Sequence, residues 1–298
     1  MSSQDFGTRP SITTRPPATA NLMIDSADRN ENIFATPFDF QIQKNQALLN
    51  GFFTRIATSE VALEWAVPNI NTNLGTDTVV FDCSQSTYTV TLQNSFYTVE
   101  ELLRALPQRM NQVVGTANGA INQFSTSYVG ASPNPILANN APKAFTFSTT
   151  ALIDKIMDPS VQTTNGSIKS FLPSIDLRPT RYIDFVSEDL TYNQNLKDNS
   201  TAEFPRDVLN RWYFDWDSAP ELDGFGYPIL MGQSQFAARR IYNPPKFIRW
   251  EPTQPVGNTR FQLYDDQGQL MTYLNNTAPL SNGVQATNWL MTLQVSEN

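Results

Sequence analysis

The feature that most constrains the fold is a strict alternation of apolar and polar residues in two runs near the start of the chain. The apolar positions are Phe38, Phe40 and Ile42 in the first run, and Val61, Leu63, Trp65 and Val67 in the second. A period of two is typical of β-strands that bury one face and expose the other. The sequence therefore predicts two strands here, whose inward faces contribute to a core.

The second run contains an irregularity. Its apolar parity changes between Ile56 and Val61, so residues before and after this point would face opposite sides of a regular strand. One extra residue in the strand, a β-bulge, corrects such a change. We therefore expect one long strand interrupted by a bulge.

Residues 75–158 differ because they contain a helix signal. Thr98 and Glu101 have the spacing of a capping box, in which each side chain bonds the other residue's backbone N–H. Apolar residues then recur at helical spacing at Val99, Leu102, Leu103, Leu106, Met110 and Val113. We expect this helix to bend at Pro107 and to end at Gly115. Strand-like runs near 88–92, 124–128 and 145–147 surround it, in the order β-α-β-β.

Strand-like segments resume in the last third of the chain. They lie at 182–186, 226–231, 236–242, 247–250, 260–264, 269–273 and 289–295. Asp265 to Gly268 predicts a hairpin turn, because Gly268 can adopt positive φ.

Two blocks of short strands on either side of a helix-containing unit predict an all-β dominated protein: a single eight-stranded jelly roll with a small α+β insertion domain. The predicted parts are an N-terminal arm (1–21), the first part of the jelly roll (22–74), the insertion domain (75–158), a linker (159–180) and the second part of the jelly roll (181–298). The predicted core residues are Phe40, Ile42, Leu63, Trp65, Phe261, Leu263, Met291 and Leu293.

The arm is polar and rich in proline, and its arginines, Arg9 and Arg15, outnumber its single acid, Asp5. Two interpretations are open. The arm is either a loose terminus, or a tether that orders on a neighbouring subunit or lies against packaged DNA.

The composition limits the chemistry. The 298 residues include no histidine and a single cysteine, Cys83. A Ser-His-Asp triad, a Cys-His pair or a histidine metal site cannot be built within such a chain. We therefore assign no catalytic, cofactor-binding or metal-binding residue and no cofactor. Cys83 follows an apolar run and is predicted to be a core residue.

The charge pattern favours contact with other proteins. A net charge of −8 argues against a dedicated nucleic-acid binder. Charged residues make up only 16% of the chain, which suggests large neutral interfaces. We expect no membrane span and no secretory signal, because no apolar run has the required length and the first residues lack the required pattern.

Three polar groups suggest other chemistry. Asp215 and Asp217 flank Trp216 and could act as the acid pair of a glycosidase. The oxygens of Asp25, Asp28, Asn30 and Glu31 could bind calcium, although a local pair or cap formed by Asp28 and Arg29 is the simpler interpretation. Arg239 and Arg240 could bind phosphate, but neighbours in a strand face opposite sides.

Five segments carry a resemblance to a known family: the hook residues Ile24, Asp25, Ser26, Asp28 and Arg29, the strand from Pro37 to Ile42, the strand from Arg55 to Ile70, and the segments 180–198 and 261–270. These segments resemble the penton (minor capsid) proteins of virophages and Polinton-like viruses. The resemblance implies a non-enzymatic protein of the virion. It also implies a homopentamer at the vertices of an icosahedral capsid, next to the major capsid protein, made in the host cytoplasm.

The same resemblance suggests further partners. Packaged DNA is a candidate partner of the arm, and a host receptor or fibre is a candidate partner of the insertion domain. The alternative function is a carbohydrate-binding or glycan-hydrolysing β-sandwich, with the aromatic residues of 212–216 as its sugar platform.

Overall fold

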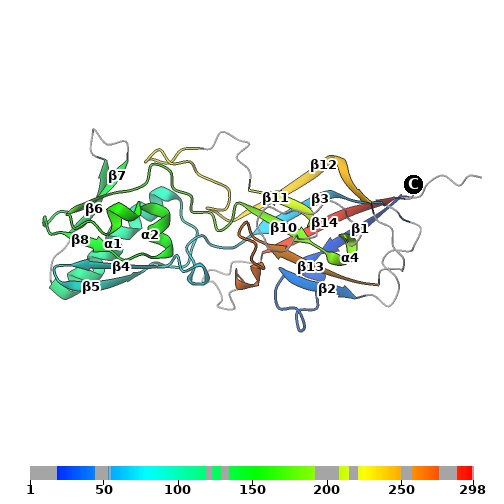
Figure 1. Cartoon of the computed structure of the whole chain (residues 1–298), viewed down its shortest axis with the longest axis horizontal. Helices are drawn as coiled ribbons and strands as arrows, with labels where there is room; N and C mark the ends of the chain where they lie inside the picture. Colours follow the sequence, from blue (N-terminus) through cyan, green and yellow to red (C-terminus); the bar gives the residue numbers. More distant parts are fainter. Residues whose placement is uncertain are drawn as a thin grey trace, which may run out of the picture.

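The computed structural model describes residues 19–43, 53, 55–118, 123–128, 134–191, 208–214, 221–249, 257–274 and 287–296. These residues form an elongated molecule with one lobe at each end of its long axis (Figure 1). The first lobe consists mainly of two β-sheets, and the second combines short sheets with helices. The protein is therefore dominated by β-structure, as predicted.

The first lobe contains two antiparallel four-stranded sheets. One sheet has the order β1 (Thr19–Asp25), β14 (Asn288–Ser296), β3 (Arg55–Trp65) and β12 (Phe236–Arg249). The other has the order β11 (Val208–Tyr213), β10 (Tyr182–Val186), β13 (Asn258–Tyr264) and β2 (Asp39–Gln43). Three short helical turns accompany them: η1 (Ser26–Asp28), α4 (Glu188–Thr191) and η3 (Met271–Leu274).

A single hydrophobic core lies between these sheets. It contains all eight predicted core residues, of which Ile42 is partly buried and the others are fully buried. The prediction succeeded because one face of each strand packs against the opposite sheet, so burial follows the alternation in sequence.

The expected β-bulge in β3 is confirmed at Ser59. Glu60 pairs with Thr292 of β14 and Thr58 pairs with the next residue, Leu293, so Ser59 is the extra residue. Its hydroxyl donates a hydrogen bond of 3.0 Å to the Thr292 carbonyl. The bulge places Ile56 and Val61 on the same buried face, although five positions separate them.

The second lobe has its own hydrophobic core. One three-stranded sheet has the order β5 (Ser86–Thr91), β4 (Thr78–Cys83) and β8 (Phe145–Phe147). The other has the order β6 (Phe124–Tyr128), β7 (Pro135–Asn139) and β9 (Ile168–Ser170). The helical elements are η2 (Thr72–Leu74), α1 (Val99–Asn118), α2 (Ala151–Ile156) and α3 (Pro159–Gln162).

The predicted capping box begins α1. The Thr98 backbone N–H donates to Glu101 Oε2 at 2.8 Å, and the Glu101 N–H donates to Thr98 Oγ1 at 3.2 Å. The prediction that the helix ends at Gly115 is wrong, because α1 continues to Asn118.

Pro107 lies inside α1. Proline has no N–H, so it cannot donate to the carbonyl of Leu103 four residues earlier. The hydroxyl of Thr126, in β6, donates to that carbonyl at 2.8 Å instead. A side chain of the adjacent sheet therefore replaces the missing helical hydrogen bond.

The predicted linker at 159–180 is wrong, because this segment is part of the second lobe. It contains α3 and β9, and Phe171, Ile175 and Leu177 are buried in the second core. The polar residues and prolines that suggested a linker alternate with these core positions.

Other strand predictions also need correction. Residues 226–231 form no strand, and 269–273 lead into the turn η3. The segments 236–242 and 247–249 fall on one strand, β12, whose pairing with β3 shifts between Ile241 and Lys246, and Trp250 lies outside the described residues. Strands β1, β4, β7, β9 and β11 were not predicted. The turn before Gln269 is confirmed, with Gly268 at a φ of 84°.

The core assignment leads to a graded prediction. Leu63→Ala should lower the free energy of unfolding by about 2–5 kcal/mol, because the side chain is fully buried and its removal leaves a cavity. Ile42→Ala should cost less, since Ile42 is only partly buried. Urea denaturation measures both values, and equal costs would contradict the assigned burial.

Replacement of Thr126 tests whether its hydroxyl compensates for the hydrogen bond that Pro107 cannot donate. Thr126→Val should cost about 1–3 kcal/mol, because it leaves a carbonyl in the helix without a donor. In a Pro107→Ala background the backbone N–H returns, so the same change should cost much less. A double-mutant cycle of unfolding free energies gives the difference, and additive costs would contradict this explanation.

Candidate assembly surfaces

The described residues were searched for metal-binding groups, a reactive cysteine and membrane-spanning helices. No group of three or more His, Cys, Asp or Glu residues that could hold a metal occurs in the described segments. Cys83 is buried, with its sulfur 3.6 Å from the Asn139 side-chain amide, so it is the core residue that we predicted. None of the helices in these segments is long and apolar enough to cross a membrane.

The hook, defined here as residues 25–38, is held by its own side chains. Asp25 caps η1 by accepting a hydrogen bond of 2.8 Å from the Ala27 N–H. The buried guanidinium of Arg29 donates to the carbonyls of Ser26 (2.9 Å) and Phe34 (3.2 Å) and pairs with Glu31. The expected pair between Asp28 and Arg29 is therefore wrong: Asp25 is the cap and Glu31 is the partner.

These contacts also weaken the calcium hypothesis. Asp25 accepts the N–H of Ala27, Asn30 Oδ1 accepts the N–H of Asn32, and Glu31 pairs with Arg29. The candidate oxygens are thus engaged locally and do not converge on a common point.

Trp289 fixes both ends of the hook to β14. Its indole N–H donates to the Pro37 carbonyl at 2.9 Å, and its backbone N–H donates to Ser26 Oγ at 2.8 Å. Both bonds are buried. The hook therefore has a defined position at the side of the sheets where β1 and β2 lie.

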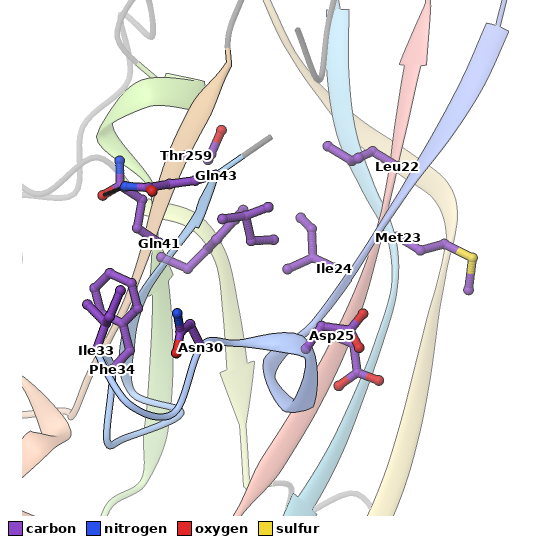
Figure 2. Close-up of a pocket in the computed structure, with 13 residues that line it drawn as sticks. Leu22, Met23, Ile24, Asp25, Asn30, Ile33, Phe34, Gln41, Gln43 and Thr259 are labelled. Carbon is purple, nitrogen blue, oxygen red and sulfur yellow. Dashed lines mark hydrogen bonds between the residues drawn. The ribbon is translucent and has the colours of Figure 1, made fainter. Parts of the chain in front are cut away.

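A cavity of about 340 Å³ lies between β1, β2, β13 and the hook. Its apolar lining residues are Leu22, Met23, Ile24, Ile33, Phe34, Ile42 and Phe261. Its polar lining residues are Asp25, Asp28, Asn30, Gln41, Gln43 and Thr259. Figure 2 shows Leu22 and Ile24 on the cavity side of β1 and the Met23 side chain pointing away from it. No lysine or arginine occurs among the described residues that line the cavity.

The opposite side of the lobe, between β11 and β12, is closed. Arg240 of β12 lies 4.6 Å from the Trp212 ring and donates to the Tyr213 carbonyl at 3.3 Å. Asn210 of β11 donates to the Tyr242 hydroxyl at 2.8 Å. These contacts connect the two sheets on this side.

Arg211 strengthens the same side. It donates to both carboxylate oxygens of the buried Asp184, at 2.6 and 2.8 Å, and its guanidinium lies 4.0 Å from the Tyr182 ring. The hydrogen bonds with Asp184 raise the pKa of Arg211 above its ordinary value, against the opposing effect of burial. The pair is bidentate and therefore rigid.

Arg239 and Arg240 face opposite sides of β12, as expected for neighbours in a strand. Arg239 pairs with Glu60, with one contact of 2.9 Å between Nη2 and Oε2. Arg240 turns toward β11. The two guanidinium groups therefore cannot hold one phosphate together.

Exposed apolar side chains occur on both sides of the first lobe. Tyr213, Ile241 and Phe247, on β11 and β12, are 48%, 64% and 41% exposed. Met23 and Ile33, on β1 and the hook, are 68% and 67% exposed. Each side thus presents apolar groups beside an edge strand that has one partner within the described residues.

The proposed sugar platform at 212–216 is not open in the described part. Trp212 and Phe214 are buried in the first core, and only Tyr213 is partly exposed. Asp215, Trp216 and Asp217 lie outside the described residues.

A strap, defined here as residues 221–234, connects the first lobe to the second. Figure 1 shows it in yellow, reaching toward the lobe that contains α1. Asp223 accepts the Glu100 N–H at 2.9 Å, and Glu100 accepts the Gly224 N–H at 2.6 Å. Tyr227 is buried in the second core and donates to the Leu172 carbonyl at 2.6 Å.

Asp176 and Arg178 stabilise the junction between the lobes. Arg178 donates to both oxygens of Asp176, at 2.9 and 2.7 Å, and to the Phe214 carbonyl at 3.0 Å. Burial alone would raise the pKa of Asp176. The hydrogen bonds and charge of Arg178 outweigh that effect and hold the pKa below its ordinary value.

Comparison with known proteins gives similarity at the level of structure. No protein-family model matches the sequence, and no curated protein matches it. The crystal structure of the selenomethionine-labelled mavirus penton protein is similar to this chain, with 11% sequence identity and a TM-score of 0.49. The similarity covers 95% of this chain and 100% of that chain.

The lowered pKa of Asp176 predicts acid sensitivity of the junction. The stabilisation is present above the unfolded pKa of about 3.9 and is lost as the pH falls through the lower folded pKa. Asp176→Asn should therefore cost about 1–3 kcal/mol at pH 7 and progressively less below about pH 4. Urea denaturation across this range tests the prediction, with Glu64→Gln, on an exposed residue, as the control. A cost that does not vary with pH would contradict it.

Proposed function

We propose that this protein is a non-enzymatic capsid protein, a penton, which forms homopentamers at the vertices of an icosahedral virion. The observation that carries the proposal is the strand order of the first lobe. Its described strands in chain order are β1, β2, β3, β10, β11, β12, β13 and β14. Numbered one to eight, they form sheets of order 1-8-3-6 and 5-4-7-2.

This order supports the predicted jelly roll. Successive strands alternate between the two sheets, except for the hairpin of β10 and β11. Jelly rolls build viral capsids and also lectins, so the fold alone leaves two classes of function. The hook and the strands β2 and β3, which resemble pentons in sequence, are the segments that begin this jelly roll, and this coincidence favours the capsid.

The position of the second lobe fits a vertex protein. It is inserted between β3 and β10, at the end of the jelly roll opposite to the start of β1 (Figure 1). We propose that the second lobe faces outward, toward a receptor or fibre, and that the opposite end of the jelly roll, where β1 starts, faces the packaged DNA. Residues 1–18 of the arm lie outside the described residues, and β1 already begins at Thr19, before the predicted boundary.

A five-fold ring needs two different complementary sides on each copy. The β1–β2 side presents Met23 and Ile33, and the β11–β12 side presents Tyr213, Ile241 and Phe247. Contact between one side and the other on the next copy would bury both groups. We propose this contact as the ring interface and the major capsid protein as the outer neighbour, in a virion assembled from protein made in the host cytoplasm.

The glycan-binding alternative receives no support from the described residues. Its aromatic platform is mostly buried, and the acids Asp215 and Asp217 lie outside the described part. A capsid role also fits the low share of charged residues, because neutral polar surfaces lose less solvation on burial.

Charge placed on the β11–β12 side tests the ring. Ile241→Asp combined with Phe247→Asp should convert pentamers to monomers, because both side chains would become charged in a buried interface. Native mass spectrometry measures the oligomer, and thermal denaturation should show an unchanged subunit. Ile168→Asp is the matched control, since Ile168 is 58% exposed but lies in the second lobe. Pentamers that survive the double change, or a wild-type protein that forms only dimers, would contradict the proposal.

A further inference from the structure

We propose that the cavity between β1 and β2 binds the N-terminal segment of a neighbouring copy, through residues 6–16. The choice of a neighbouring copy rests on the proposed ring. The binding chemistry rests on the cavity itself. The segment lies outside the described residues, so its sequence is the basis of the argument.

The lining of the cavity selects for a ligand with two kinds of group. Leu22, Ile24, Ile42 and Phe261 come from both sheets and form an apolar floor. Asp25 and Asp28 add negative charge, and no basic side chain among the described lining residues balances it. A ligand that carries an apolar group next to a cation is complementary to this surface.

Thr259 points to a ligand with hydrogen-bonding groups. It lines the cavity, is 1% exposed, and its hydroxyl has no hydrogen-bond partner in the described structure. A buried hydroxyl without a partner costs free energy that a bound polar group can recover. A peptide supplies such groups along its backbone.

The edge strands favour an extended peptide. Within the described residues, β1 and β2 each pair on one side only, with β14 and β13. Their other edges carry backbone N–H and C=O groups that an added strand can bind, while alternate side chains enter the cavity. The cavity therefore suits an extended segment with an apolar side chain and a nearby arginine or lysine.

The first residues of this chain contain such a segment twice. Phe6-Gly7-Thr8-Arg9-Pro10 and Ile12-Thr13-Thr14-Arg15-Pro16 share the pattern apolar-x-Thr-Arg-Pro, six positions apart. Each copy places a large apolar side chain three residues before an arginine. The repeat matches the apolar floor and the two acids.

Geometry favours a neighbouring copy as the source. Thr19, the first residue of β1, pairs with Ser296 near the end of the chain, while Asp25 at the other end of β1 leads into the hook. The N-terminal segment thus leaves from the end of the strand away from the hook. Thirteen positions separate Phe6 from Thr19, which span about 43 Å when extended. This length is sufficient to reach an adjacent subunit.

Disulfide cross-linking between full-length chains tests the proposal. Thr13→Cys is introduced in one preparation and Gln41→Cys, in the cavity lining, in another. Native Cys83 is buried, and oxidation of the wild-type protein measures any cross-linking through this residue. Mixing and mild oxidation should give a covalent heterodimer, and a synthetic peptide of residues 5–17 should compete with it. Ser170→Cys, at an exposed site on β9 in the second lobe, is the matched acceptor control.

Two further variants test the chemistry. Asp28→Lys in the acceptor should lower the cross-linking yield about tenfold, whereas Glu64→Lys, on an exposed residue outside the cavity, should not. Thr259→Val should lower the yield about fivefold, yet leave the melting temperature of the empty subunit unchanged or raised, because it removes an unpaired hydroxyl.

The possible results are distinct. Cross-linking no greater than with Ser170→Cys would overturn the proposal. A disulfide that forms only within a chain carrying both cysteines would overturn the assignment to a neighbour. Native mass spectrometry of the wild type separates this question from the ring: pentamers without cross-links contradict only the segment binding, and cross-linked chains without pentamers contradict only the ring.

Discussion

The packing of the first lobe depends on the contacts of the buried indole ring of Trp289 with the opposite sheet. Its ring lies 5.4, 5.1 and 5.9 Å from the rings of Phe40, Phe185 and Phe261, which all belong to the opposite sheet. Its two N–H groups hold the hook at Pro37 and Ser26. One residue, through its ring and its backbone N–H, therefore sets the spacing of the sheets and the position of the hook. The cavity between β1 and β2 follows from both, because the hook closes one wall of a space that the sheets leave open.

The sequence predicted those features of the fold that follow from the regular spacing of residues along a strand or at a helix start. The parity change predicted a bulge between Ile56 and Val61, where the structure has it at Ser59, and the spacing of Thr98 and Glu101 predicted the start of α1. In both cases the pattern reflects a local rule: side chains alternate along a strand, and free N–H groups at a helix start need acceptors. The predicted core of the first lobe was correct for the same reason.

The errors share a different cause, which is that distant partners decide the burial of polar residues. In β9, Ile168 is exposed and Lys169 is buried, because the Lys169 amine donates to the carbonyls of Val161 (2.8 Å) and Gln162 (3.3 Å). Hydropathy therefore predicts the opposite burial of these two residues, which is one reason why 159–180 was predicted to be a linker. In β11, Arg211 depends on Asp184 of another strand. The cavity was also not predicted, since its lining comes from segments more than 200 residues apart.

The central proposal is that the first lobe is a jelly roll that closes the five-fold vertex of a shell, with the second lobe facing outward. Electron cryo-microscopy of intact particles that contain this protein tests it most directly. The account predicts five copies around each five-fold axis, with the β1–β2 side of one copy against the β11–β12 side of the next and the second lobe outermost. Particles whose vertices are occupied by a different protein, or in which this chain lies away from the five-fold axes, would contradict it.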